Sequence, residues 1–66
     1  MIKVNGDAVQ NAEGLTFSEY LFNTAGYTKG RIAVECNGDI VPSKEYETRV
    51  IKDGDTIEVV AFVGGG

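Results

Sequence analysis

The sequence predicts an α+β domain built from one small β-sheet with one α-helix packed across it. Short segments throughout the chain alternate apolar and polar residues, which is typical of strands with one buried face. Two Asn-Gly pairs, beginning at Asn5 and Asn37, mark the tight turns of hairpins. A single segment in the first half carries apolar residues at helical spacing behind a capping motif.

The first predicted hairpin lies at the start of the chain. "MIKV", residues 1–4, alternates as a half-buried strand does. Asn5-Gly6 follows directly and tolerates the positive φ angles of a tight turn. A second short strand through Ala8 and Val9 is therefore expected to fold back on the first.

The predicted helix starts behind Thr16. Thr16 and Glu19 form a capping box, in which each side chain accepts a hydrogen bond from the other residue's backbone N–H. Gly26 is well suited to end the helix. The positions that share one helical face are Phe17, Tyr20, Leu21, Thr24 and Ala25. We interpret the aromatic residues of this face as core packing rather than as a binding platform, and Phe22 lies off the face.

The second half of the chain predicts another hairpin and two further turns. "RIAVEC", residues 31–36, places Cys36 on the apolar side of a strand, and Asn37-Gly38 turns that strand into "DIV". Pro42 cannot donate a ladder hydrogen bond, so the second strand is expected to be short or at an edge. "SKEYE" predicts a single helical turn capped by Ser43, and "KDGD" predicts a turn.

The last strand, "TIEVVAFV" at residues 56–63, has the strongest β composition and is expected at the centre of the sheet. Alternation places Ile57, Val59 and Ala61 on one face and Glu58, Val60 and Phe62 on the other. If the helix covers the first face, Val60 and Phe62 either form a partner-docking surface or are ordinary sheet residues shielded by their neighbours. We expect one domain over residues 1–63 and a flexible glycine tail over residues 64–66.

Charge and cysteine content narrow the class of protein. The net charge is −4, with ten scattered acidic residues against six basic ones, which argues against nucleic acid as a partner. The acidic surface is better explained by solubility, with a basic protein partner as the alternative. A single cysteine excludes an internal disulfide and favours a reducing compartment. Neither a signal peptide nor a membrane span is recognisable, so we expect a cytoplasmic protein without a membrane partner.

The usual catalytic and cofactor-binding patterns are missing from the sequence. It has no histidine, and Cys36 lacks an activating base, so packing is the favoured role for this thiol. "DGD" at residues 53–55 lacks the other ligands of a calcium loop, and "GGG" precedes no helix that would bind phosphate. We therefore expect a protein that is not an enzyme and binds no cofactor or metal of its own.

The remaining functional group is the α-carboxylate of Gly66. A carboxylate is a poor electrophile, but joining it to AMP supplies a leaving group that a sulfur, nitrogen or oxygen nucleophile can displace. Three extended glycines reach about 10 Å and, lacking Cβ atoms, pass through a narrow channel. The tail is therefore interpreted as a narrow extended segment that places one carboxylate in the ATP site of another protein. The alternative is a C-terminal segment without a function.

The second half resembles a known family. "IAVECNGDIVPSKEYETRVIKDGDTIEVVAFVGGG", residues 32–66, is similar to the sulfur carrier proteins of thiamine biosynthesis, the ThiS family. The shared features are a strand into "NG", a following "VP", an aromatic residue, "DGD", an apolar strand and a terminal diglycine. The first half has the matching order and length.

This resemblance implies a ubiquitin-like β-grasp fold with one mixed sheet of four to five strands. It also implies that an E1-like adenylyltransferase of the ThiF type uses ATP to adenylate Gly66. A sulfur donor system then converts the terminus to a thiocarboxylate, and a ThiG-type thiazole synthase receives the sulfur. Gly65 and Gly66 match the functional pair, and Gly64 is one glycine more than the family motif asks for. Ser43 and Tyr46 depart from the family, where a basic residue and a tryptophan are common.

The sequence leaves three alternative functions open. The same chemistry serves carriers for molybdopterin and for cysteine synthesis. A ubiquitin-like modifier would instead pass its terminus to lysine side chains. A third class is a plain interaction domain whose tail has no role.

Overall fold

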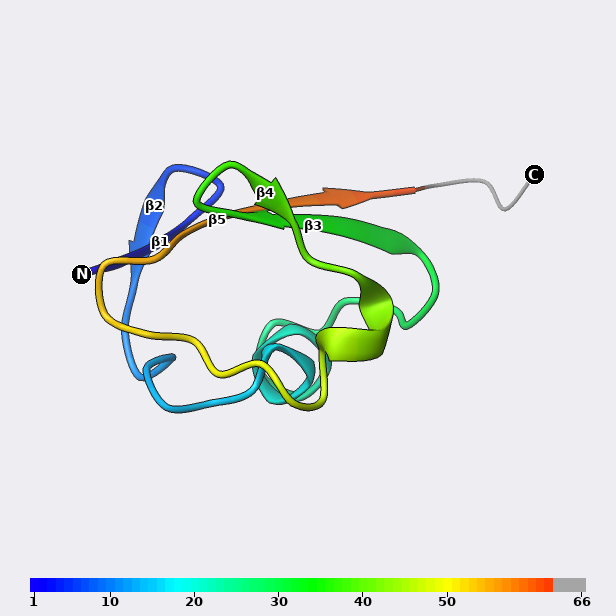
Figure 1. Ribbon diagram of the computed structural model, residues 1–66, viewed down its shortest axis with the longest axis horizontal. Helices are drawn as coiled ribbons and strands as arrows, with labels where there is room; N and C mark the ends of the chain where they lie inside the picture. The colour runs from blue at the N-terminus through cyan, green and yellow to red at the C-terminus, as the bar shows by residue number, and fades with distance from the viewer. Residues whose placement is uncertain (63–66) are drawn as a thin grey trace.

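The computed structural model describes residues 1–62 and contains a five-stranded sheet and two short helical segments (Figure 1). In chain order the elements are β1 (Ile2–Val4), β2 (Asp7–Val9), η1 (Glu19–Thr24), β3 (Ile32–Cys36), β4 (Asp39–Ile40), η2 (Ser43–Glu45) and β5 (Thr56–Ala61). The predicted α+β class with a single sheet is confirmed. The predicted tail at residues 64–66 lies outside the described residues.

The sheet is mixed, with the order β2-β1-β5-β3-β4. The two hairpins, β1 with β2 and β3 with β4, are antiparallel. The last strand, β5, lies between them, parallel to β1 and antiparallel to β3. The predicted central place of this strand is confirmed, as is the edge position of β4. The strand has six residues and ends at Ala61, within the predicted limit of eight.

Both hairpins turn through their Asn-Gly pairs, as predicted. The φ angles are 52° at Asn5 and 86° at Gly6, and 55° at Asn37 and 89° at Gly38. Positive φ at both central positions is the requirement of the hairpin turn. The two asparagines also fasten β5: Oδ1 of Asn5 accepts from Val59 N at 2.7 Å, and Oδ1 of Asn37 accepts from Thr56 N at 2.9 Å.

The helical layer begins with the predicted capping box. Thr16 N donates to Oε1 of Glu19 at 2.8 Å, and Glu19 N donates to Oγ1 of Thr16 at 3.1 Å. Phe17 and Ser18 make the first helical residues, and η1 then widens into bonds of the i→i+5 type, as from Ala25 N to Tyr20 O at 2.8 Å.

Because of these wide turns, the buried face of the helix differs in part from the predicted face. Phe17, Tyr20 and Leu21 are buried as expected, but Thr24 and Ala25 are exposed. Each wide turn takes more residues than the 3.6 of an α-helix, so positions seven and eight along no longer share the face of the first residue. The predicted end of the helix at a glycine is confirmed, because Gly26 has φ of 80°.

The segment after β4 also differs in one detail from the expectation. η2 supplies the predicted helical turn, but Ser43 lies within it and the capping position belongs to Pro42, without a side-chain cap. Proline fits the entry to a helix because the first backbone N–H groups have no helical partner there. The predicted turn at "KDGD" is confirmed, with φ of 92° at Gly54.

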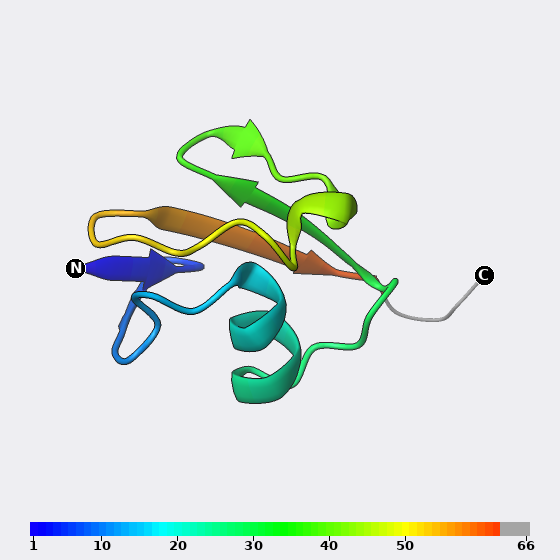
Figure 2. The ribbon, with the colours of Figure 1, turned by 60° about the horizontal axis from the view of Figure 1, so that its bottom comes forward.

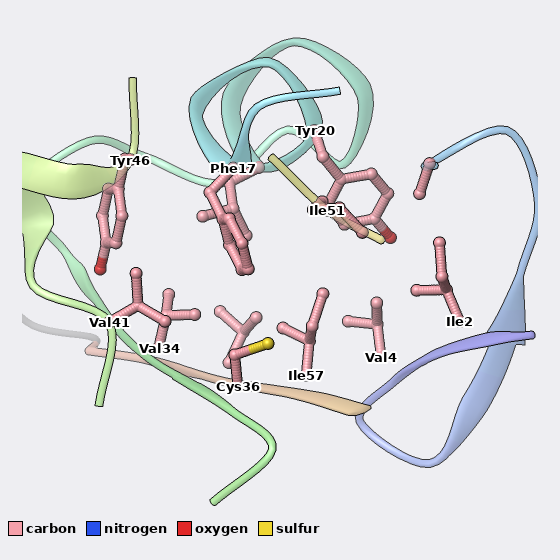
Figure 3. Packing of buried hydrophobic residues seen from close by; sticks show 13 residues of the cluster. Ile2, Val4, Phe17, Tyr20, Val34, Cys36, Val41, Tyr46, Ile51 and Ile57 are labelled. Atoms are coloured by element: carbon pink, nitrogen blue, oxygen red, sulfur yellow. The ribbon is translucent and has the colours of Figure 1, made fainter. Parts of the chain in front are cut away.

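The core lies between the sheet and the helical layer (Figure 3). Figure 3 shows Phe17 and Tyr20 pointing from the helix towards the sheet, Phe17 above Cys36 and Tyr20 above Val4. The fully buried large side chains are Phe17, Leu21, Ile51, Ile57, Val34, Val41 and Cys36. Both helical segments lie on the same side of the sheet, so within residues 1–62 its other face is uncovered (Figures 1 and 2).

Candidate functional site

The predicted site consists of the glycines Gly64, Gly65 and Gly66 and the two residues expected to dock a partner, Val60 and Phe62. The three glycines lie outside the described residues. The structure does describe the strand that leads to them, together with Val60 and Phe62.

β5 has a partner strand on both sides at its start and one partner strand, β3, over the rest of its length. Its first half pairs with β1, with Lys3 opposite Thr56, and its full length pairs with β3, from Cys36 opposite Ile57 to Ile32 opposite Ala61. Order in the backbone continues one residue beyond the strand, because Phe62 N donates to Arg31 O at 2.8 Å. The backbone therefore stays hydrogen-bonded to the neighbouring segment as far as Phe62, the last residue that the structure describes.

Val60 and Phe62 are exposed at 59% and 55% of their surface. They alternate with Ile57 and Val59, which are buried beneath the helical layer. Their exposure means that neighbouring side chains do not shield them within the described part of the chain. Docking through these two residues stays a prediction, and exposure is the property that it requires.

Ala61 does not follow the buried residues of its own face. It is exposed and borders an open groove of about 440 Å³ at the end of the sheet. The groove is lined by Gly26, Tyr27, Thr28, Arg31, Ile32, Ala61 and Phe62. Its walls come from the loop after η1 and from the ends of β3 and β5. Sequence alternation does not reveal this groove, because the helical layer does not reach the last residue pair of β3 and β5, Ile32 and Ala61.

Cys36 is buried in the core, which confirms its predicted packing role. Burial raises the pKa of its thiol, and the nearby Asp55 carboxylate raises it further. A thiol held protonated is a weak nucleophile. The chemistry of the site is therefore not expected to involve this cysteine.

Two further findings concern the described residues as a whole. Residues 1–62 contain no group of three or more His, Cys, Asp or Glu side chains that could hold a metal ion. Neither helical segment in this range has the length and apolar character to cross a membrane.

The order of the strands, the helical layer on one face and the central last strand define the class as a ubiquitin-like β-grasp domain. The crystal structure of the thiamine biosynthesis protein ThiS from Geobacter metallireducens is similar, with a TM-score of 0.76, 33% sequence identity and coverage of 98% of this chain and 97% of that chain. The model of the ThiS family matches residues 2–66. The chain belongs to the ThiS family.

Two curated relatives differ greatly in length. A thiazole synthase of Paramagnetospirillum magneticum is 38% identical over 63 residues, which are 96% of this chain and 19% of that protein. The uncharacterized protein ycf40 of Porphyra purpurea is 32% identical over 65 residues, which are 98% of this chain and 90% of that protein. The chain thus spans about a fifth of the first relative and nearly all of the second.

Proposed function

We propose that this chain is a sulfur carrier whose Gly66 carboxylate is activated, converted to a thiocarboxylate and used in forming the thiazole of thiamine. The observation that carries the proposal is the family match, which covers residues 2–66 and therefore includes Gly66. Gly64 and Gly65 serve as the narrow lead that places Gly66 in the active site of a partner.

The chemistry consists of an adenylyl transfer followed by an acyl transfer. In the first, a carboxylate oxygen of Gly66 attacks the α-phosphorus of ATP, pyrophosphate leaves, and an acyl-adenylate forms. In the second, hydrosulfide delivered by the donor system attacks the acyl carbon, AMP leaves, and loss of the sulfur-bound proton gives the thiocarboxylate. The chain is then a protein co-substrate, and the ATP belongs to a ThiF-type adenylyltransferase.

Thiazole synthase is the proposed acceptor of the sulfur. In Paramagnetospirillum magneticum, a segment similar to this chain is part of a longer protein named thiazole synthase. A carrier joined to its acceptor in one polypeptide works at a high effective concentration, which is a physical reason for such an arrangement. This relative favours the thiamine pathway over molybdopterin or cysteine synthesis. The reaction is placed in the cytoplasm, where thiols stay reduced.

The test is to incubate the chain with ATP, a ThiF-type enzyme and a sulfur donor, and to measure its intact mass. We expect the exchange of one oxygen for sulfur, located in the C-terminal peptide. A variant with one alanine added after Gly66 is the matched control and should not react. Sulfur incorporation into the extended variant would contradict the proposal, and conjugates on denaturing gels would indicate a protein modifier instead.

A further inference from the structure

A groove of about 390 Å³ lies between the two helical segments, on the side of the sheet that these segments cover (Figures 1 and 2). Phe22 of η1 and Tyr46, the residue after η2, form its aromatic wall, with ring centroids 6.1 Å apart. Phe22 is half-buried and Tyr46 is buried, so both rings are held by the core behind them. We name this feature the η1–η2 groove, and it shares no lining residue with the groove beside Ala61.

Basic groups outnumber acidic groups in the η1–η2 groove, although the chain as a whole has a net charge of −4. Lys29 and Lys44 line it, and Glu47 supplies an acidic group. Lys29 Nζ lies 3.9 Å from Oε2 of Glu47, and the two side chains are 78% and 74% exposed, so this ion pair is weak. Lys44 forms no ion pair within residues 1–62. The groove therefore has positive charge available for an anionic group from outside the domain.

The hydroxyl groups of Ser18 and Ser43 also line the groove. Neither hydroxyl forms a hydrogen bond within the described part of the chain. A carboxylate accepts hydrogen bonds and donates none, so ammonium and hydroxyl donors suit it. An apolar side chain beside that carboxylate would cover the aromatic wall. The groove therefore fits a protein segment that carries an Asp or Glu next to an apolar residue.

The groove lies near the point where β5 ends. Gly30 lines it, and the next residue, Arg31, accepts a hydrogen bond from Phe62 N at 2.8 Å. Figure 2 shows the loop before β3 reaching the end of β5, with η2 on the same side. Gly66 is four residues beyond Phe62, so an extended chain separates the two by at most about 14 Å. A protein that takes up Gly66 therefore comes within reach of the groove.

Two enzymes take up the tail in the proposed function, and the small size of the groove favours one of them. A single carboxylate contact in a groove of this size gives little affinity when the partner is free in solution. Such a contact is sufficient where the two partners are held together. Thiazole synthase is the enzyme that shares one polypeptide with a similar segment in Paramagnetospirillum magneticum.

We propose that the η1–η2 groove docks an acidic segment of thiazole synthase. An Asp or Glu carboxylate of that segment lies between Lys29 and Lys44, and an apolar side chain covers Phe22 and Tyr46. The proposal rests on the proposed function, because it takes thiazole synthase as the acceptor of the sulfur. It adds to that function the surface and the charge by which the acceptor holds the carrier.

The first measurement is the dissociation constant with a ThiG-type thiazole synthase. Lys44→Gln should bind about tenfold more weakly than Lys52→Gln at low salt, and the difference should shrink at high salt. Lys52 is the matched control, because it is an exposed lysine outside the groove and its substitution changes the net charge equally. Equal affinities for the two variants, or no binding of the unchanged chain, would overturn the proposal.

A second variant predicts a change of the opposite sign. Glu47→Gln removes the carboxylate that competes for Lys29, so it should bind the synthase about threefold more tightly than Glu13→Gln. Glu13 is an exposed glutamate outside the groove, and its substitution changes the net charge by the same amount. Binding of Glu47→Gln that is no tighter than that of the control would contradict an acidic occupant.

Two measurements on the chain alone exclude simpler explanations. The urea midpoint of Lys44→Gln should equal that of Lys52→Gln, because both side chains are exposed and neither forms an ion pair within residues 1–62. Sedimentation should show a monomer. A lower midpoint for Lys44→Gln would attribute its weaker binding to the fold. A dimer that depends on Lys44 would assign the groove to a second copy of the chain, and either result would overturn the proposal.

Sulfur incorporation by a ThiF-type enzyme separates this inference from the proposed function. All the variants should gain sulfur as the unchanged chain does, and a loss confined to Lys44→Gln would assign the groove to the adenylyltransferase and overturn the proposal. If binding to the synthase depends on Lys44 but the unchanged chain gains no sulfur, the groove stands and the carrier function fails. If the unchanged chain gains sulfur but Lys44→Gln and Lys52→Gln bind the synthase alike, the carrier function stands and the groove fails.

Discussion

The two faces of β5 have opposite properties although their residues alternate along one short strand. Ile57 and Val59 are buried against the helical layer, whereas Glu58 and Val60 are exposed on the uncovered face. The inner residues pack in the core, whereas the outer residues make no contact with the core in the described part of the chain. A domain this small can therefore place its stability on one face of its central strand and leave the other face exposed, which is the property that the predicted docking through Val60 requires.

The largest expected effect belongs to the inner face. Ile57→Ala removes a fully buried side chain from a close-packed core and should lower the free energy of unfolding by about 3 kcal/mol. Val60→Ala on the same strand is the matched control and should change it by less than about 0.5 kcal/mol. Urea denaturation measures both. Similar losses for the two variants would mean that the faces do not divide these roles.

Ile57→Val provides a milder version in case the alanine variant does not fold. It keeps the β-branched shape of the side chain and should cost about 1 kcal/mol. A cost close to zero would show that the core at this position is loosely packed.

A smaller effect is expected from the layer that covers the inner face. Thr16→Ala removes the hydroxyl that accepts from Glu19 N, and should lower the free energy of unfolding by about 1 kcal/mol. Thr16→Ser retains the hydroxyl and should retain most of the stability. Thermal or urea unfolding of both variants provides the measurement. Equal losses would indicate that the capping hydrogen bond is not what Thr16 contributes.

The smallest effect concerns the start of β5 and depends on pH. Partial burial raises the pKa of Asp55, but hydrogen bonds from Lys52 N at 2.9 Å and Asn37 Nδ2 at 3.0 Å outweigh it and hold the pKa below its usual value of 3.8. A carboxyl with a lowered pKa in the folded state stabilises above its unfolded pKa, and this contribution is lost as the pH falls through the folded value.

Asp55→Asn should therefore be less stable than the unchanged chain at about pH 6, and the gap should close towards about pH 2. Asp7→Asn serves as the control, because the Asp7 side chain is exposed and forms no hydrogen bond with the residues described here. Urea midpoints across this range give the comparison. A gap that stays constant with pH would assign the effect to shape rather than to ionisation.

Local sequence signals predicted most of the elements. The Asn-Gly pairs specified both hairpins, because few other residues accept positive φ at two successive positions. The capping box specified where the helix begins, since its two hydrogen bonds depend only on residues three apart. Alternation in β5 predicted that Val60 and Phe62 face away from the core, and this prediction needed no information about the neighbouring strands.

Features that depend on packing between distant segments could not be predicted in this way. The wide turns of η1, which expose Thr24 and Ala25, are not specified by apolar spacing. The groove beside Ala61 depends on how far the helical layer reaches across the sheet. The fastening of β5 by Asn5 and Asn37 joins residues 54 and 19 positions apart.

The sequence by itself determined the strands, their buried faces, the two turns and the start of the helix, because these follow from side-chain period and local hydrogen bonds. Only the tertiary structure decided that Glu35 lies opposite Glu58 and that Ile40 joins Val60 on one surface. Register between strands is set by the fit of the whole sheet against its helical layer, and no single strand contains that information. Alternation therefore identified the outward residues, and the fold determined which of them meet.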